Sequence, residues 1–263
     1  MRVCDGIALA KEFGSYFAYS LMGFHLGCSR EWIFLHLGDE LDREAEFIAL
    51  LERYKSGEPL EYITGQCEFM GREFVVGRGV LIPRPESEIL VQKTLEIASK
   101  FKSPKIAEIG VGSGIISISL ALELKNAKII ATDISPKALE IAAINRDGFG
   151  VSVELVLSNY LDEIDGEFDI IVSNPPYIAA NYPLDKWVLS EPKTALIGGE
   201  VGDEMLKDIA QIAKSRAKYL ICEMGYDQRA PMQEYLNSLG FKSEFYADLA
   251  GLDRGFVAYN KER

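Results

Sequence analysis

The sequence predicts an α/β fold, in which a mostly parallel sheet carries helices on both faces and follows a small helical domain. Apolar residues recur at helical spacing before residue 65, whereas short apolar runs alternate with helical patterns from residue 86 onward. Alternation of the second kind is typical of parallel sheets, because each crossover between parallel strands runs through a helix. Glycines punctuate the stretch between the two patterns, which favours a link between two domains.

Residues 1–64 are predicted to form the helical domain. Apolar residues within 7–24 favour one or two helices, those within 32–37 a short third helix, and those within 41–54 a fourth that ends near Gly57. The position of this domain beside the link suggests a part in reading a protein substrate.

Residues 65–85 are predicted to form a β-hairpin linker. The segment 67–82 alternates in hydropathy and is interrupted by Gly71, Gly77 and Gly79. The α/β domain then spans residues 86–263.

The α/β domain should contain alternating strands and helices that end in an antiparallel pair of strands. The expected strands are 105–110, 128–133, 151–158, 168–174, 218–225, 241–247 and 255–260, and the expected helices are 116–124, 136–145, 203–215 and 227–239. In such sheets ligands bind beyond the carboxyl ends of the strands, where the strand order reverses.

Composition narrows the function class. The chain has 263 residues and a formal net charge of −12, which argues for a protein or small-molecule substrate and against nucleic acid, since nucleic-acid binders usually present a basic face. With no run of eighteen apolar residues and no signal-peptide layout, we expect a cytoplasmic protein with no membrane partner. The four cysteines and two histidines show no metal-ligand spacing, so no metal is expected.

A glycine-rich turn, EIGVGSG at residues 108–114, follows the first expected strand and leads into a helix. Glycines let the backbone turn tightly and approach a ligand closely. They would also serve a tight strand-to-helix turn without a ligand, so this motif alone leaves both interpretations open.

Asp133 ends the second expected strand, nineteen residues after Gly114. An acid at this point can accept hydrogen bonds from both ribose hydroxyls of a nucleoside. Asp133 would alternatively cap the next helix, but Ser135 directly precedes Pro136 and suits that task better. The two motifs together fit either a nicotinamide dinucleotide or S-adenosylmethionine.

Asn159 and Tyr160 follow the third expected strand. A polar residue beside an aromatic one could bond the amino group of an adenine and cover its ring. A simple loop with one packed aromatic side chain is an equally good interpretation.

The most specific motif is Asn174-Pro175-Pro176-Tyr177, directly after the fourth expected strand. Two prolines fix φ twice and remove two donors, so the Pro175 carbonyl is held rigidly beside the side-chain oxygen of Asn174. Two acceptors at a fixed separation suit an NH2 group, and Tyr177 offers a flat face to a planar substrate. The alternative is a proline-rich turn that merely ends the strand.

Amide nitrogen is a poor nucleophile because its lone pair is delocalised into the carbonyl group. Two acceptors that hold its hydrogens orient the group and favour the charge that develops on nitrogen during transfer. A strong base is not required before transfer, which agrees with the lack of a suitably placed histidine.

The Asn-Pro-Pro-Tyr motif resembles that of methyltransferases acting on planar nitrogens, both adenine N6 and glutamine N5. Longer segments, 59–91, 131–139, 168–178 and 191–206, resemble the bacterial release-factor glutamine N5-methyltransferases, the HemK/PrmC family. The resemblance implies a seven-stranded Rossmann-like sheet, S-adenosylmethionine as cofactor, and as substrate the glutamine of the Gly-Gly-Gln loop in class I peptide chain release factors.

The resemblance also implies the site residues. The expected cofactor-binding residues are Glu108, Gly110, Val111, Gly112, Ser113, Gly114, Asp133, Ile134, Asn159, Tyr160 and Asn174. The expected catalytic and substrate-binding residues are Asn174, Pro175, Pro176 and Tyr177, with Arg84 and Glu86 as further substrate-binding residues.

Three positions qualify this resemblance. Glu108 stands where the family usually has Asp, Ser87 stands where it usually has Thr, and Tyr160 stands where aromatic and other apolar residues vary. Pro83 and Pro85 hold Arg84 and Glu86 in a fixed loop, and a surface ion pair that anchors the linker is the alternative to a substrate-binding role.

Other functions share part of this pattern. A glutamine methyltransferase of a ribosomal protein and an adenine N6-methyltransferase of nucleic acid share the motif, although the second would need basic recognition loops in an acidic chain. A nicotinamide-dependent oxidoreductase, or a binding protein that only senses the cofactor, would leave the rigid acceptor pair unused.

Overall fold

The computed structural model describes residues 1–260, which divide into two compact units. The first unit comprises Met1–Gln66 together with Asp185–Ser190, and the second comprises Cys67–Leu184 and the chain from Glu191 onward. No pattern in the sequence predicted that residues 185–190 would belong to the same unit as the N-terminal helices.

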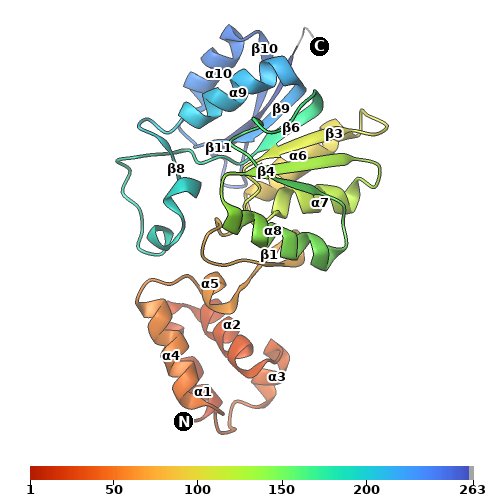
Figure 1. Cartoon of the computed structure of the whole chain (residues 1–263). Coiled ribbons are helices and arrows are strands. Elements are labelled where there is room, and N and C mark those ends of the chain that lie inside the picture. Colours follow the sequence, from red (N-terminus) through yellow and green to blue (C-terminus); the bar gives the residue numbers. More distant parts are fainter. Residues whose placement is uncertain (261–263) are drawn as a thin grey trace. The chain divides into compact units, whose positions relative to one another are not determined.

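The first unit is helical, as predicted (Figure 1). Its helices are α1 (Val3–Ala10), α2 (Ser15–Leu26), α3 (Arg30–Leu35), α4 (Glu44–Lys55) and α5 (Leu60–Thr64), with short 3-10 turns at Lys11–Phe13 and Val188–Ser190. Gly27 ends α2 in a left-handed conformation, and the Ser29 side chain caps α3 by accepting a hydrogen bond from the Trp32 amide. Leu21, Met22 and Phe47 are fully buried in the core of this unit.

The hairpin is shorter than predicted. Strands β1 (Gln66–Phe69) and β2 (Arg72–Val75) pair through a turn at Met70 and Gly71, both of which have positive φ. The expected hairpin to residue 82 was wrong in its extent, because the chain from 76 to 86 is irregular. Prolines near its end donate no ladder hydrogen bond, and glycines before them disfavour a strand.

The second unit contains the predicted seven-stranded sheet, in the order β10-β11-β9-β6-β3-β4-β5. Its strands are β3 (Lys105–Ile109), β4 (Lys128–Asp133), β5 (Glu154–Leu157), β6 (Phe168–Ser173), β9 (Ala217–Glu223), β10 (Phe241–Ala247) and β11 (Asp253–Asn260). Strand β11 pairs antiparallel with both β10 and β9, whereas the other pairs in this sheet are parallel, and β10 with β11 is the predicted antiparallel pair.

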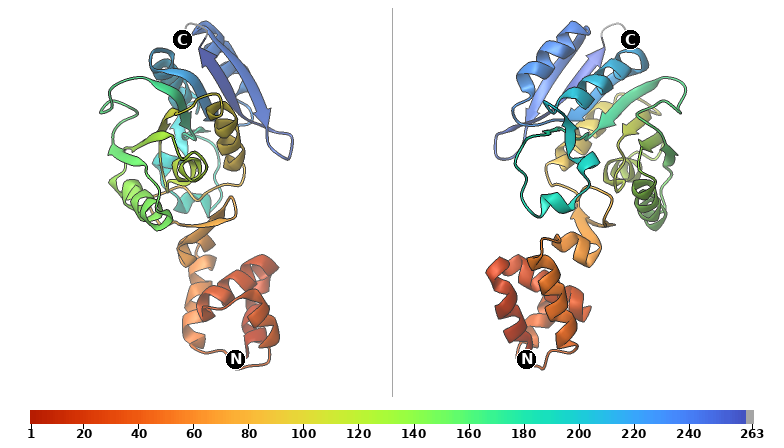
Figure 2. Two further views of the ribbon diagram at one scale, coloured as in Figure 1. Left: turned by 90° about the vertical axis from the view of Figure 1, so that its right-hand side faces the viewer. Right: turned by 60° about the vertical axis from the view of Figure 1, so that its left-hand side comes forward.

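Helices cover both faces of the sheet (Figures 1 and 2). The helices are α6 (Ser87–Ala98), α7 (Ile115–Glu123), α8 (Pro136–Phe149), α9 (Glu204–Arg216) and α10 (Arg229–Ser238). Side chains alternate along β6, so Ile170 and Val172 pack with α6 and α7 while Ile171 packs with α9. Because both faces of the central strands β3, β6 and β9 are buried, these strands read as nearly continuous apolar runs.

Among the helices and strands expected in the seven-stranded sheet and its covering layers, two boundaries differ from the expectation by three residues or more, and the others by two at most. Helix α8 continues to Phe149 and ends at Gly150, which has a φ of 64°. The amide of Val151 bonds the Arg146 carbonyl, so the first residues of the expected strand 151–158 complete the helix end and β5 begins at Glu154.

A second, two-stranded sheet follows β6. Strand β7 (Ile178–Ala179) pairs with β8 (Ile197–Gly199), and a Cβ at Gly198 would lie 2.4 Å from the Pro176 carbonyl oxygen. Only glycine allows β8 to lie this close to the segment after β6.

Two features are absent from the described part of the chain: a helix able to span a membrane and a cluster of metal ligands. Over residues 1–260, none of the helices combines the length and apolarity that a membrane span requires. In the same part of the chain, His, Cys, Asp and Glu side chains do not gather in groups of three or more that could hold a metal ion.

Candidate active site

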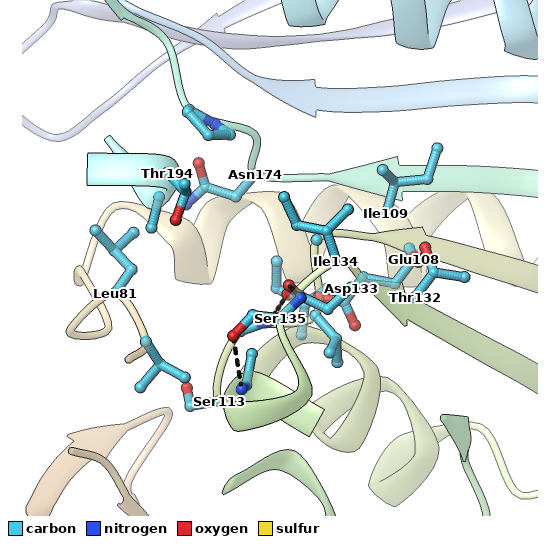
Figure 3. A pocket seen from close by; sticks show the side chains of 18 of the residues that line it. Leu81, Glu108, Ile109, Ser113, Thr132, Asp133, Ile134, Ser135, Asn174 and Thr194 are labelled. Carbon is cyan, nitrogen blue, oxygen red and sulfur yellow. Dashed lines mark hydrogen bonds between the residues drawn. The ribbon is translucent and has the colours of Figure 1, made fainter. Parts of the chain in front are cut away.

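A cavity lies at the carboxyl ends of β3, β4, β5 and β6, within the second unit (Figure 3). The space between its lining residues, including its open mouth, is about 990 Å³. The chain leaves β3 toward β4 and β5 and returns to β6 on the other side, so the strand order reverses beside β3. This is the position that the sequence predicted for the chemistry.

The glycine turn forms one wall. Gly110, Gly112 and Gly114 have φ angles of 80°, 54° and 86°, which side-chain-bearing residues rarely adopt. A Cβ would meet open space at the first two positions, whereas at Gly114 it would lie 2.7 Å from the Ile118 side chain. The first two glycines therefore leave room for a ligand, and the third permits close packing of α7.

Asn145 of α8 holds this turn from behind. Its side-chain NH2 donates to the carbonyls of Ser113 and Val75, both at 2.8 Å, and its Oδ1 accepts from the Val75 amide at 2.7 Å. Asn145 is buried, so the turn is fixed to β2 by a fully used carboxamide. The sequence showed this residue only as part of a helix.

Asp133 lies at the end of β4 and is half-buried beside the cavity. Its carboxylate accepts from the Gly112 amide at 3.0 Å and from the Ser135 amide at 2.9 Å. Ser135 caps α8 by accepting from the Ala138 amide, as predicted, and Pro136 is the first helical residue. Figure 3 shows Asp133 and Ser135 together at this turn.

Glu108 is completely buried under the glycine turn. One carboxylate oxygen accepts from the Ser117 amide at 2.9 Å, while the other, Oε1, is buried without a hydrogen-bond partner in the described chain. Burial raises the pKa of Glu108 to about 8, although its hydrogen bond with Ser117 opposes this and nearby Asp133 adds to it. An unpartnered buried oxygen beside a cavity marks a place for a ligand donor.

Asn159 and Tyr160 line the cavity after β5. Asn159 is exposed and donates to Asp162 at 2.9 Å, whereas the Tyr160 hydroxyl donates to Asp208 at 3.0 Å. Burial, helped by Asp208, raises the pKa of Tyr160 to about 12. Tyr160 has a positive φ of 46°, an uncommon conformation for a tyrosine that turns the chain sharply after the strand.

Arg84 lines the cavity and forms an ion pair with Glu191. The Glu191 side chain is only 1% exposed, and its second oxygen accepts from the Ile82 amide at 2.8 Å. Glu191 thus anchors the loop that carries Arg84, through an ion pair whose acidic member is buried. The sequence did not single out Glu191, although the segment 191–206 carried the resemblance.

The segment after β6 places Asn174 and Pro176 on the cavity wall. The Asn174 side-chain nitrogen donates to Ser87 Oγ at 2.9 Å, and its Oδ1 has no hydrogen-bond partner within residues 1–260. The Pro175 carbonyl is also without a partner in that range. Tyr177 points its hydroxyl at Glu223, at 3.0 Å.

The cavity brings together most of the predicted residues from distant parts of the chain. Those that line it are Arg84, Glu108, Gly110, Val111, Gly112, Ser113, Asp133, Ile134, Asn159, Tyr160, Asn174 and Pro176. Those outside its lining are Glu86, Gly114, Pro175 and Tyr177. Lining residues that the sequence did not indicate include Leu81, Ser87, Thr132, Thr194, Ala195 and Met205.

Comparison with known proteins identifies two family models in the chain. Residues 85–188 match a methyltransferase small domain, and residues 16–65 match a PrmC N-terminal domain.

Among solved structures, a ribosomal protein L11 methylase from Lactobacillus delbrueckii subsp. bulgaricus has a TM-score of 0.52 and 23% identity, over 68% of this chain and 80% of that one. A methyltransferase from Pyrococcus furiosus has a TM-score of 0.54 and 17% identity, over 83% and 97% of the two chains. At these identities the likeness concerns the fold alone.

Sequence relatives are much closer. A release factor glutamine methyltransferase from Koribacter versatilis is 37% identical over 249 residues, which cover 90% of this chain and 88% of the relative. Proteins of the same name from Aquifex aeolicus and Neisseria gonorrhoeae are 38% and 39% identical, over 81% and 82% of this chain and 78% and 81% of the relatives. The chain belongs to the release factor glutamine methyltransferase family.

Proposed function

We propose that this enzyme transfers a methyl group from S-adenosylmethionine to the side-chain amide nitrogen, N5, of the glutamine in the Gly-Gly-Gln motif of class I release factors. The observation that carries the proposal is Asn174, a residue of the cavity wall whose side-chain oxygen has no partner in the described chain. The carbonyl of the next residue, Pro175, is likewise without a partner there. The names of the relatives supply the substrate, and the cytoplasmic location stays a prediction.

The cavity fits the cofactor on three counts. Gly110 and Gly112 leave open space where a Cβ would stand. Asp133 offers carboxylate oxygens for ribose hydroxyls. Glu108 Oε1 is a buried acceptor that can bind a donor such as an ammonium group. Tyr160 lines the same cavity and would cover the adenine ring. When bound, S-adenosylmethionine supplies an electrophilic methyl group on its sulfonium.

The chain itself contributes positioning and electrostatics. Asn174 Oδ1 and the Pro175 carbonyl accept the two hydrogens of the substrate NH2, which orients the nitrogen and favours the positive charge that it gains. No base of the chain need act before transfer. Afterward the proton leaves through one of these acceptors or through water.

Arg84 and Glu191 shape the entrance for the protein substrate in this proposal. Their ion pair fixes the loop at 82–84 on the cavity wall. We assign Glu86, which does not line the cavity, to contact with the release factor outside it.

The test is transfer of labelled methyl from S-adenosylmethionine to a purified class I release factor, beside the same factor with its Gly-Gly-Gln glutamine changed to alanine. Label on the first and none on the second is the expected result. Label on neither, with label on a ribosomal protein or on nucleic acid instead, would overturn the proposed substrate and keep the transfer chemistry.

A further inference from the structure

Two buried side chains are hydrogen-bonded in series with Asn174, and both are far from it in the sequence. Ser87 begins α6 and Glu223 ends β9, and both residues are almost inaccessible to solvent, with exposures of 0% and 1%. Ser87 Oγ lies 2.7 Å from Glu223 Oε2 and 2.9 Å from the Asn174 side-chain nitrogen. Asn174 is thus joined to a buried carboxylate through one hydroxyl group.

The hydrogen bonds that join Asn174, Ser87 and Glu223 all run in one direction, from donor to acceptor. Ser87 Oγ donates its single proton to Glu223 Oε2, and the Tyr177 hydroxyl donates to the other carboxyl oxygen. The hydroxyl then has only lone pairs left for Asn174, which must turn its NH2 toward Ser87. The carboxamide oxygen of Asn174, which is a residue of the cavity lining, is then left without a partner in the described chain.

We infer that Ser87 and Glu223 are positioning residues of the proposed reaction, which hold the Asn174 carboxamide with its oxygen toward the substrate NH2. Without them the two ends of the carboxamide differ little in energy, and a flipped Asn174 would present a donor to a donor. The inference rests on the proposed function only where it assigns the substrate NH2 to that oxygen.

Glu223 also holds the other end of the motif. The Tyr177 hydroxyl donates to Glu223 Oε1 at 3.0 Å, and the Gln228 side chain donates to the Tyr177 carbonyl at 2.9 Å. Burial raises the pKa of Glu223, while its hydrogen bonds with Ser87 and Tyr177 and the nearby Arg254 guanidinium act in the opposite direction. One carboxylate therefore restrains both Asn174 and Tyr177.

Steady-state transfer to the release factor tests the inference. Ser87→Ala should lower kcat by about 10–100-fold, the order that a misplaced positioning group costs, and should leave KM for S-adenosylmethionine within about 3-fold. Ser119→Ala is the matched control, because Ser119 is equally buried, its hydroxyl has no partner in the described chain, and it lies outside the cavity lining. Its kcat should equal that of the wild type.

The Asn174→Ala background separates positioning from general damage. If Ser87 acts only through Asn174, Ser87→Ala should cause no further loss of kcat in that background. Glu223→Gln should also lower kcat without lowering Tm, because a glutamine can donate to Ser87 and so permits the flipped carboxamide. An unchanged kcat in Ser87→Ala, or losses that multiply in the double variant, would overturn the inference.

A second readout does not depend on the substrate. In protein labelled with 15N-asparagine, the side-chain NH2 signals of Asn174 are those that Asn174→Ala removes. Their hydrogen exchange should be slower in the wild type than in Ser87→Ala. Equal exchange rates would contradict the proposal that Ser87 holds the Asn174 NH2 group. Failure of the wild type to methylate the release factor would instead overturn the proposed function. The exchange rates would still show whether Ser87 and Glu223 position the Asn174 side chain.

Discussion

The glycine turn after β3 and the Asn-Pro-Pro-Tyr segment after β6 lie at the ends of neighbouring strands, yet they satisfy their polar groups differently. At the glycine turn, the backbone shapes the wall and the buried Glu108 keeps one oxygen unpartnered. After β6, Asn174 and Tyr177 are tied to the buried Ser87 and Glu223. The difference suggests that one wall is left to be completed by a cofactor, while the other is prearranged for a reaction.

The largest effect should come from Asn174→Ala. Loss of one preorganised acceptor at the reacting group should lower kcat by about 100–1000-fold, whereas the cofactor Kd should change by less than about 5-fold. Methyl-transfer kinetics and calorimetry measure the two quantities. If Asn174→Ala still transferred methyl at the wild-type rate, the segment after β6 would not be prearranged for the reaction, and its contrast with the glycine turn would be lost.

A pH-dependent effect is expected from Glu108. Its folded-state pKa of about 8 lies above the ordinary 4.5, so the folded protein binds more protons between these values and its unfolding free energy falls as pH rises through them. In Glu108→Gln this part of the decline should be absent, and the difference between the two proteins should reach a few kcal/mol above pH 8.

Denaturant unfolding of both proteins across this pH range, without cofactor, measures the difference. Parallel curves of unfolding free energy against pH for the two proteins would mean that Glu108 titrates normally in the folded state. Burial of Glu108 beside the glycine turn would then not destabilise the folded protein.

A smaller effect is expected from Asp133→Ala. The change removes the proposed ribose acceptor and leaves the Gly112 and Ser135 amides without their partner, which should weaken cofactor binding by about 1–3 kcal/mol. Calorimetric titration measures this, with Asp147→Ala at the exposed end of α8 as the control. Unchanged affinity would assign Asp133 to the turn alone.

The smallest effect should come from Tyr160→Phe. The variant loses only the hydrogen bond to Asp208 and keeps the ring, so cofactor affinity should change by less than about 1 kcal/mol. Tyr160→Ala should cost more, because the ring itself is removed. Equal losses in both variants would show that the hydroxyl and not the ring matters at this wall.

Local chemistry explains why so much of the sheet was predictable. A short apolar run predicted β4 with its observed bounds, and β10 was also predicted with its observed bounds, although this edge strand carries Lys242, Ser243 and Glu244 and is partly exposed. Ser135 and Pro136 marked the start of α8 through their own backbone preferences. The predicted boundaries were wrong where hydrogen bonds to other segments decide them. The pairing of β1 with β2 ends the hairpin at Val75, and the end of α8 delays the start of β5 to Glu154.

The site divides in the same way. The sequence by itself determined the glycine turn, Asp133 and Asn174, because positive φ requires glycine and because residues that end parallel strands meet at one edge of the sheet. Only the tertiary structure brought Ser87 and Glu223 behind Asn174, and Glu191 beneath Arg84. These partners are separated by 87 to 136 residues, and a hydrogen bond between such distant residues depends on how the whole chain packs, so it leaves no pattern in the local sequence.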